Sequence, residues 1–250
     1  MASAKFIPYR KFAEVYDSLM DQQDFYESYY EFIINILQKL DFNPKNILEL
    51  GCGTGKLTEI FLRNSYDAEG LDLSEAMLAV ARKRGLKVHH GNMADFNLGK
   101  KYGLIMSIFD SINYLENKLQ LEKCFGRVYE HLDNDGLFIF DVNSDYKINE
   151  YIPKVNKTGH YQIGNAGLIW ENLHKPDTWI AKITMVEGRR KYFEEHVEKA
   201  YSLKAITGLL EKSGLDVVGV YGDFEFNKVR KDSLKWFFVC RKLLKPLPAP

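Results

Sequence analysis

The first forty residues repeat apolar side chains with the spacing of an α-helix. Between Asp24 and Leu40 they recur every three or four positions, which places them on one helical face: Phe25, Tyr29, Phe32, Ile33, Ile36, Leu37 and Leu40. Asp24 is the predicted N-cap, with Glu27 as its capping-box partner. Asn43-Pro44 ends the helix, because the residue before proline disfavours helical backbone.

Short apolar runs and helical repeats then alternate along the chain. The runs predict strands at 46–50, 68–73, 86–90, 102–109 and 137–142. Helical spacing separates them at 56–63, at 75–84 after the cap Ser74, and at 121–132. The strands are apolar almost throughout, as in a parallel sheet whose two faces are both covered by helices.

The pattern changes after Ser144. From about Tyr161 to Tyr201, β-branched and aromatic residues with turn signals at 175–177 and Gly188 predict antiparallel hairpins. A helix capped by Ser202 and closed by Gly214 follows, and then strands at 216–221 and 234–241. The hairpins are therefore an insertion between two α/β units, and the main sheet is expected to have seven strands.

Composition narrows the class of partner. The chain has 34 Lys and Arg against 34 Asp and Glu, so it has no net field to hold a polyanion, and neither nucleic acid nor an anionic membrane is expected as main partner. Cys52, Cys124 and Cys240 are far apart and odd in number, which favours a reducing compartment over disulfides. No signal-peptide stretch and no membrane-spanning run is present, so we expect a cytoplasmic protein.

A glycine-rich turn carries the most specific signal. Gly51, Gly53 and Gly55 stand between a strand and a helix, where glycine allows the backbone to approach a ligand closely. The turn lies at the carboxyl end of its strand, the edge at which open α/β sheets bind ligands. Asp72 ends the next strand, where its carboxylate can accept hydrogen bonds from both hydroxyls of a ribose.

A dinucleotide site is the competing interpretation of this turn. Its glycines follow G-x-G-x-x-G, whereas this chain has G-x-G-x-G. Glu49 also precedes the first glycine by two residues, and its carboxylate would repel a pyrophosphate. The same carboxylate suits a nucleoside that carries an ammonium and a sulfonium, so the residues favour a cationic nucleoside.

The motifs together resemble the class I S-adenosylmethionine-dependent methyltransferases. Glu49–Gly55 is similar to motif I of that family, and Gly70–Ser74 to the motif after it. Four further segments resemble the adenine-binding, methyl-transfer, lid and inserted-strand motifs of small-molecule members: Gly91–Phe96, Leu104–Leu115, Phe12–Asp17 and Glu194–Tyr201. The last resembles members near the sugar-amine and glycine N-methyltransferases.

The resemblance implies a Rossmann-like α/β fold with a seven-stranded, mostly parallel sheet and helices on both faces. It implies an N-terminal helical lid at 1–43, a cofactor-binding domain at 44–143 and 202–245, and an inserted antiparallel substrate subdomain at 144–201. The expected cofactor is S-adenosyl-L-methionine, with S-adenosyl-L-homocysteine as product. The cofactor-binding residues it implies are Glu49, Gly51, Gly53, Gly55, Asp72, Leu73, Met77, Asn92, Met93 and Phe109.

Catalytic candidates lie in the predicted lid, after the fourth strand and in the insertion. Tyr16 and Tyr114 are expected to wall the methyl-transfer site, and His196 is a candidate base. His89 and His90 are adjacent on a strand and point to opposite faces, so no metal site is expected. Cys52 has no evident base beside it and is interpreted as a small buried side chain.

The function implied is methyl transfer to a small molecule, with nitrogen as the favoured acceptor atom. Two alternatives remain open from the residues. The chain could bind S-adenosylmethionine as a catalytically silent regulatory protein, or it could be a nicotinamide-dependent dehydrogenase. A monomer and a homodimer are both compatible with the sequence.

Overall fold

The structure is a computed structural model, and it describes residues 9–20, 25–155 and 157–243 of the 250-residue chain. The predicted N-cap Asp24 and the tail 245–250 lie outside the described residues.

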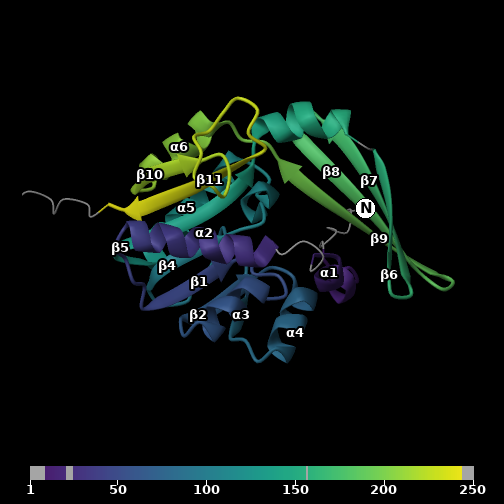
Figure 1. Ribbon diagram of the computed structural model, residues 1–250, viewed down its shortest axis with the longest axis horizontal. Coiled ribbons are helices and arrows are strands. Elements are labelled where there is room, and N and C mark those ends of the chain that lie inside the picture. Colours follow the sequence, from purple (N-terminus) through teal and green to yellow (C-terminus); the bar gives the residue numbers. More distant parts are fainter. Residues whose placement is uncertain (1–8, 21–24, 156, 244–250) are drawn as a thin grey trace, which may run out of the picture.

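Seven strands form the main sheet, as predicted (Figure 1). Their order is β10-β11-β5-β4-β1-β2-β3, in which β11 runs antiparallel to β5 and β10, and the other neighbours are parallel. From β1 the chain adds β2 and β3 on one side and then crosses to add β4 and β5 on the other. The carboxyl ends of β1 and β4 therefore form a topological switch point, where such sheets bind ligands. The strands are β1 (Asn46–Leu50), β2 (Asp67–Asp72), β3 (Val88–His90), β4 (Tyr102–Ser107), β5 (Leu132–Asn143), β10 (Leu215–Tyr221) and β11 (Lys235–Lys242).

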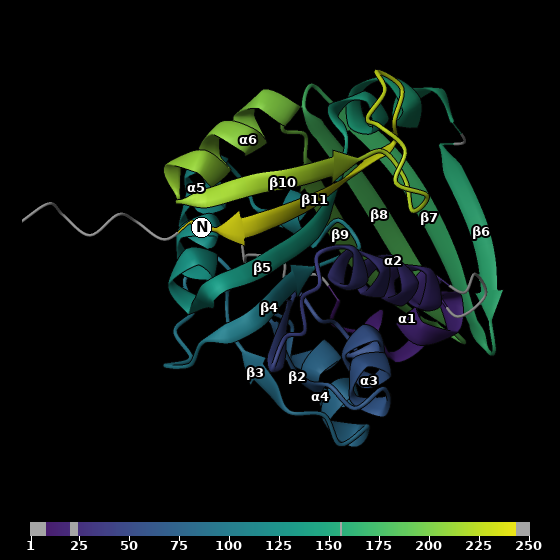
Figure 2. The ribbon, with the colours of Figure 1, turned by 60° about the vertical axis from the view of Figure 1, so that its left-hand side comes forward.

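Helices cover both faces of this sheet, which explains why its strands are apolar on both sides (Figure 2). Ile47 packs on one face with α2 (Phe25–Lys39) and α3 (Lys56–Arg63), while its neighbour Leu48 packs on the other with α5 (Lys118–His131) and α6 (Leu203–Lys212). Both residues are 0% exposed. The helix α4 (Glu75–Lys83) begins at Ser74, as predicted, and lies against β2 and β3.

A second sheet of four antiparallel strands lies beside the main one, in the order β6-β7-β8-β9 (Figure 1). Its strands are β6 (Thr158–Ile163), β7 (Ala166–Lys175), β8 (Thr178–Glu187) and β9 (Arg190–Lys199). The predicted turns at 175–177 and Gly188 join β7 to β8 and β8 to β9. One face packs on the N-terminal segment, where Phe12 and α1 (Ala13–Met20) meet Leu168, Ile183 and Met185.

The predicted boundary between a helix and the strand after it needs correction at Leu132. Leu132, assigned to a helix by its spacing, instead begins β5, because it pairs with Tyr102 in the sheet. The predicted strand at 137–142 is therefore longer at its start. The segment after β5 also turns helical at η3 (Lys147–Tyr151) and η4 (Ile152–Lys154), with Ser144 accepting a hydrogen bond from the backbone N–H of Lys147.

Within the described residues, no helix is long and apolar enough to cross a bilayer.

Gly70 fixes how closely β2 approaches the glycine turn. It pairs with Glu49 on β1 and with Val88 on β3. A Cβ atom at Gly70 would lie 2.5 Å from the sulfur and 2.7 Å from the Cβ of buried Cys52, so one of them would have to shift. The absence of a side chain at Gly70 therefore allows the turn to sit against β2.

Gly70→Ala is expected to destabilise the fold by roughly 1–3 kcal/mol, because overpacking forces β2 and the turn apart. Gly126→Ala is the matched control, since Gly126 lies within α5 and a Cβ there meets no atom within 4 Å. The control should gain about 0.5–1 kcal/mol through helix propensity. Urea unfolding of both variants measures the two changes, and a Gly70→Ala protein as stable as the parent would contradict this packing argument.

Candidate cofactor and active site

One pocket opens at the carboxyl ends of the central strands. It is lined by the turn after β1, the end of β2, the residues after β3 and β4, and tyrosines from the N-terminal segment and α2. The structure brings every predicted site residue to this lining except Gly55 and His196. Elements far apart in the sequence thus converge where the glycine turn predicted a ligand.

The glycine turn has the backbone that its composition predicts. Gly51 and Gly53 have φ of 71° and 54°, in the left-handed region that favours glycine. A Cβ atom on Gly51 would lie 2.7 Å from the hydroxyl oxygen of Ser111, so a side chain there would collide with the segment after β4. Gly55 precedes α3 as its N-cap and does not face the pocket, so its part in the turn is conformational.

Asp72 joins the turn to the next helix. Its carboxylate accepts hydrogen bonds from the backbone N–H of Gly53, at 2.8 Å, and of Ser74, at 2.7 Å. Burial raises the pKa of Asp72 above its ordinary value, although these backbone N–H groups act to lower it. The carboxylate of Asp72 is therefore held by one backbone donor in the turn and one at the start of α4. Leu73 and Met77 of the same segment also line the pocket.

Glu49 is a buried acid with no hydrogen bond from a basic side chain among residues 9–20, 25–155 and 157–243. It is 3% exposed, and the hydroxyl of Thr58 donates to it. Burial raises the pKa of Glu49 to about 8, and the charge of nearby Asp72 adds to the rise. A cation in the pocket would favour its ionised form, which agrees with the cationic nucleoside favoured by the sequence.

Tyrosines form the opposite wall of the pocket. Tyr16 and Tyr114 line it as predicted, and Tyr9 and Tyr26 join them. The Tyr9 ring lies 5.7 Å from that of Tyr16, edge to face, and its hydroxyl is 2.8 Å from that of Tyr114. The sequence indicates an aromatic N-terminal segment but contains no signal that singles out Tyr9 or Tyr26.

The N-terminal segment is attached to the glycine turn, to the end of α4 and to the second sheet. Asp17 on α1 accepts a hydrogen bond from Thr54 in the glycine turn, at 2.5 Å, and pairs with Arg84 at the end of α4. On the other side, Glu194 of β9 accepts hydrogen bonds from the backbone N–H groups of Tyr9, Lys11 and Phe12, at 2.7, 2.8 and 2.9 Å. These contacts hold the tyrosines over the pocket.

His196 lies behind this wall, not in the pocket. It is 4% exposed, its ring centroid is 4.5 Å from that of Tyr9, and its Nδ1 is 3.1 Å from the Tyr114 hydroxyl. The predicted candidate base therefore reaches the site through Tyr114.

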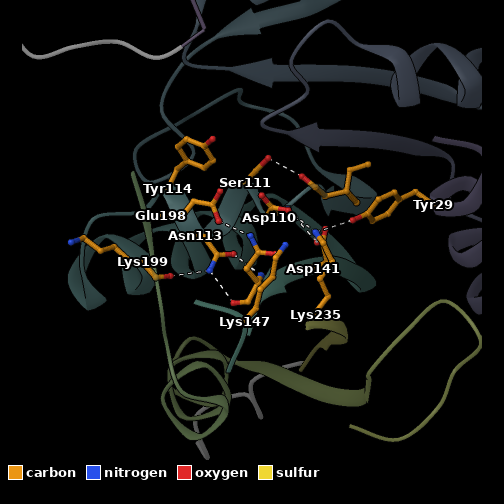
Figure 3. Close-up of polar contacts among 12 residues, drawn as sticks. Tyr29, Asp110, Ser111, Asn113, Tyr114, Asp141, Lys147, Glu198, Lys199 and Lys235 are labelled. Atoms are coloured by element: carbon orange, nitrogen blue, oxygen red, sulfur yellow. Dashed lines mark hydrogen bonds and ion pairs between the residues drawn. The ribbon is translucent and has the colours of Figure 1, made fainter. Parts of the chain in front are cut away.

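A buried charge network supports the segment after β4 (Figure 3). The ammonium of Lys235 lies 2.5 Å from Asp110 and 2.5 Å from Asp141, and 3.3 Å from the Tyr29 hydroxyl. Phe109 and Asp110 both have positive φ, 54° and 53°, a strained backbone that needs such support. No sequence pattern links Lys235 to Asp110, because only the antiparallel pairing of β11 with β5 brings it there.

The two adjacent histidines have separate partners. His89 lies 3.1 Å from Glu69, and His90 lies 3.0 Å from the carbonyl oxygen of Leu73. Across residues 9–20, 25–155 and 157–243, no group of three or more His, Cys, Asp or Glu is placed to hold a metal ion.

Comparison with known proteins points to one class of enzyme. The family described as "Methyltransferase domain" matches residues 47–136. A crystal structure of an S-adenosylmethionine-dependent methyltransferase from Clostridium acetobutylicum ATCC 824 is 29% identical, covers 93% of this chain and 98% of its own, and superposes with a TM-score of 0.82. A Geobacillus sp. (strain WCH70) protein, provisionally named a methyltransferase, is 29% identical over 94% of this chain and 99% of its own.

A third relative is similar over a shorter region. The dTDP-3-amino-3,4,6-trideoxy-alpha-D-glucopyranose N,N-dimethyltransferase of Streptomyces venezuelae is 34% identical over 44% of this chain and 47% of its own length.

The sheet order and the glycine turn with its acid define a nucleoside-binding α/β protein. Together with these similarities, they support a class I S-adenosylmethionine-dependent methyltransferase. It is an enzyme of that class, and its cofactor is S-adenosylmethionine.

Glu49→Gln is expected to remove a source of alkaline instability. Because the folded pKa of Glu49, about 8, exceeds that of an exposed glutamate, the folded state holds the extra proton, and stability falls as pH rises between the two values. The variant cannot ionise, so it should be more stable than the parent at pH 8.5, by at least about 1 kcal/mol, and this advantage should shrink towards pH 5.

Urea unfolding at both pH values measures the difference, with Glu130→Gln as the control because its side chain is 55% exposed on α5. Parallel pH profiles for Glu49→Gln and the parent would contradict the buried, proton-holding state of Glu49.

Proposed function

We propose that the protein transfers a methyl group from S-adenosylmethionine to the nitrogen of a small-molecule amine. The observation that carries this proposal is the two-ended pocket, with a buried carboxyl and a glycine turn at one end and hydrogen-bonded tyrosines at the other. The Streptomyces venezuelae relative, named as a sugar N,N-dimethyltransferase, supports an amine as the acceptor.

The pocket residues fit the cofactor piece by piece. Gly51 and Gly53 leave room for its methionine part, and Glu49 can face the cationic ammonium. Asp72 can accept hydrogen bonds from the ribose hydroxyls while it retains its two backbone donors. Asn92 and Met93 line the side expected for adenine, and Phe109 with Tyr114 lines the side expected for the methyl group.

The work left to the protein is positioning and control of protons. The cofactor supplies a methyl group on a positively charged sulfur, which is already a good leaving group. Tyr16 and Tyr114 can confine the acceptor nitrogen in line with that methyl group, and such ordering contributes several kcal/mol to the rate. An amine must also reach the methyl group without its extra proton, since only the neutral amine has a free lone pair.

We also propose that the enzyme works in the cytoplasm. Cys52, Cys124 and Cys240 are all free and buried, which agrees with a reducing compartment.

Asp72→Ala should weaken the binding of S-adenosylmethionine at least tenfold, because a charge-assisted acceptor of this kind is worth roughly 1.5–3 kcal/mol. Isothermal titration calorimetry measures the change. Asp67→Ala is the matched control, since Asp67 lies at the other end of β2 and its side chain is 68% exposed. Unchanged affinity in a folded Asp72→Ala protein would contradict the assignment of Asp72 to the ribose.

Methyl-labelled S-adenosylmethionine tests the acceptor class directly. The panel contains free and nucleotide-linked amino sugars, simple alkyl amines, and matched compounds in which a hydroxyl replaces the amine. We expect label on the amines and not on the matched hydroxyl compounds. Label on hydroxyl compounds alone would overturn N-methylation, and tight cofactor binding with no turnover on any compound would instead indicate a silent regulatory protein.

A further inference from the structure

Four side chains form a line from the pocket into the second sheet. Tyr9 and Tyr114 line the pocket with their hydroxyls 2.8 Å apart. Behind them, the Tyr114 hydroxyl is 3.1 Å from Nδ1 of His196, and Nε2 of His196 is 3.5 Å from Oε2 of Glu194. His196 and Glu194 both belong to β9, two residues apart and therefore on the same face of the strand.

Glu194 determines which ring nitrogen of His196 carries the proton. A bare Nε2 would turn its lone pair towards the carboxylate, which is repulsive, whereas an Nε2–H would be attracted to it. Nδ1 is then the acceptor, so Tyr114 donates to His196 and Tyr9 donates to Tyr114. Burial raises the pKa of the Tyr114 hydroxyl, which keeps its proton available for donation.

The ring edge of His196 opposite Tyr114 faces a buried carboxylate. Nε2 is buried and has no hydrogen-bond partner among the described residues, in a side chain that is 4% exposed. Burial acts to raise the pKa of Glu194, but the imidazole and the backbone N–H groups of Phe12 and Tyr9 outweigh it, and that pKa lies below its usual value. An ionised carboxylate therefore faces the ring edge opposite Tyr114, as in hydrolase triads in which an acid orients and stabilises a histidine.

We infer that Glu194, His196 and Tyr114 form a relay that takes a proton from the acceptor amine before methyl transfer. This inference rests on the proposed function and deepens it. Tyr114 touches the acceptor and is the catalytic residue, while His196 holds the proton and Glu194 is a positioning residue. The same Glu194 holds the backbone of Tyr9, Lys11 and Phe12, so closure of the N-terminal segment and orientation of the imidazole depend on one carboxylate.

The proton and electron balance is simple. An ammonium acceptor gives a proton to the Tyr114 oxygen as the Tyr114 proton moves to Nδ1 of His196, which leaves a neutral amine and an imidazolium facing Glu194. The amine lone pair then forms the new N–C bond, and the C–S bond breaks with its electron pair left on sulfur. After the product leaves, the imidazolium returns its proton through the Tyr114 hydroxyl to solvent in the pocket, so one proton is released per turnover.

Several titratable groups lie around this relay and contribute to the pH dependence of its activity. Glu194 faces His196 from β9, and Tyr9 and Tyr114 face it from the N-terminal segment and η2 (Ser111–Tyr114). The charges of Glu198, Asp110 and Tyr16 also raise the pKa of Tyr114. These neighbours titrate in the parent and in the variants alike. The ratio of variant to parent kcat/KM at each pH therefore removes their contribution.

His196→Asn tests the relay, because the asparagine oxygen can accept the Tyr114 hydrogen bond at the Nδ1 position but cannot take up a proton. The acceptor is the amine from the panel above that shows the highest turnover. We expect kcat/KM near pH 7 to fall roughly 10²–10⁴-fold, the usual contribution of a positioned acid–base group, with affinity for S-adenosylmethionine unchanged. The deficit should narrow as pH rises, because more of the amine is already neutral in solution.

His160→Asn is the matched control on exposed β6 and should behave as the parent. A His196→Asn deficit that stays constant from pH 7 to pH 9.5 indicates a structural histidine and overturns the relay, as does a loss below threefold.

A second measurement does not depend on activity, and comparison with the His196→Asn spectrum assigns the His196 signals among the six histidines. Nitrogen-15 NMR of the histidine-labelled parent should show His196 as the Nε2–H tautomer, with Nδ1 bare. The Nδ1–H tautomer would overturn the relay even if amines are methylated. Conversely, absence of methyl transfer to every amine would reject the proposed function, while the tautomer still decides whether Tyr114 donates to His196.

Discussion

The site depends on the carboxylate of Asp72. One of its oxygens accepts the N–H of Gly53 and the other accepts the N–H of Ser74, so a single side chain joins the glycine turn to the start of α4. Ser74 extends the connection, because its hydroxyl accepts from the N–H of Met77 and donates to the carbonyl oxygen of Tyr9. The end of β2 therefore positions the turn, a helix and the N-terminal segment together.

Buried charge is distributed unevenly around this point. Asp110 and Asp141 share the ammonium of Lys235 and support a strained backbone after β4. Glu49, in contrast, lines the pocket, and within the part of the chain that the structure describes its side-chain hydrogen bond comes from the hydroxyl of Thr58. Burying an acid in this way costs stability unless the acid is protonated or a cation arrives. A positively charged ligand in the pocket would offset this cost by favouring the ionised form of Glu49.

Sequence reasoning predicted the features that depend on local pattern. The strand at Asn46–Leu50, the cap at Ser74 and the hairpin turn at Gly188 all follow from residue type and spacing, and the structure confirms them. The glycine turn and Asp72 were predictable because the carboxyl ends of neighbouring parallel strands meet at one edge.

Contacts set by tertiary packing were not predictable. Tyr9 reaches Tyr114 because Glu194, far along the chain, accepts from its backbone N–H and Ser74 donates to its carbonyl oxygen. Lys235 reaches Asp141 through the pairing of β11 with β5, which leaves no trace in local spacing. Leu132 continued a helical repeat, and strand pairing overrode that pattern.

The central claim is that one end of the pocket holds the nucleoside of the cofactor against Asp72. A crystal structure of the protein with S-adenosylhomocysteine tests it most directly. We expect both ribose hydroxyls within hydrogen-bond distance of the Asp72 carboxylate, with the sulfur directed towards Phe109 and Tyr114. A nucleoside bound away from the carboxyl ends of β1 and β2, or a ribose that does not contact Asp72, would contradict the claim.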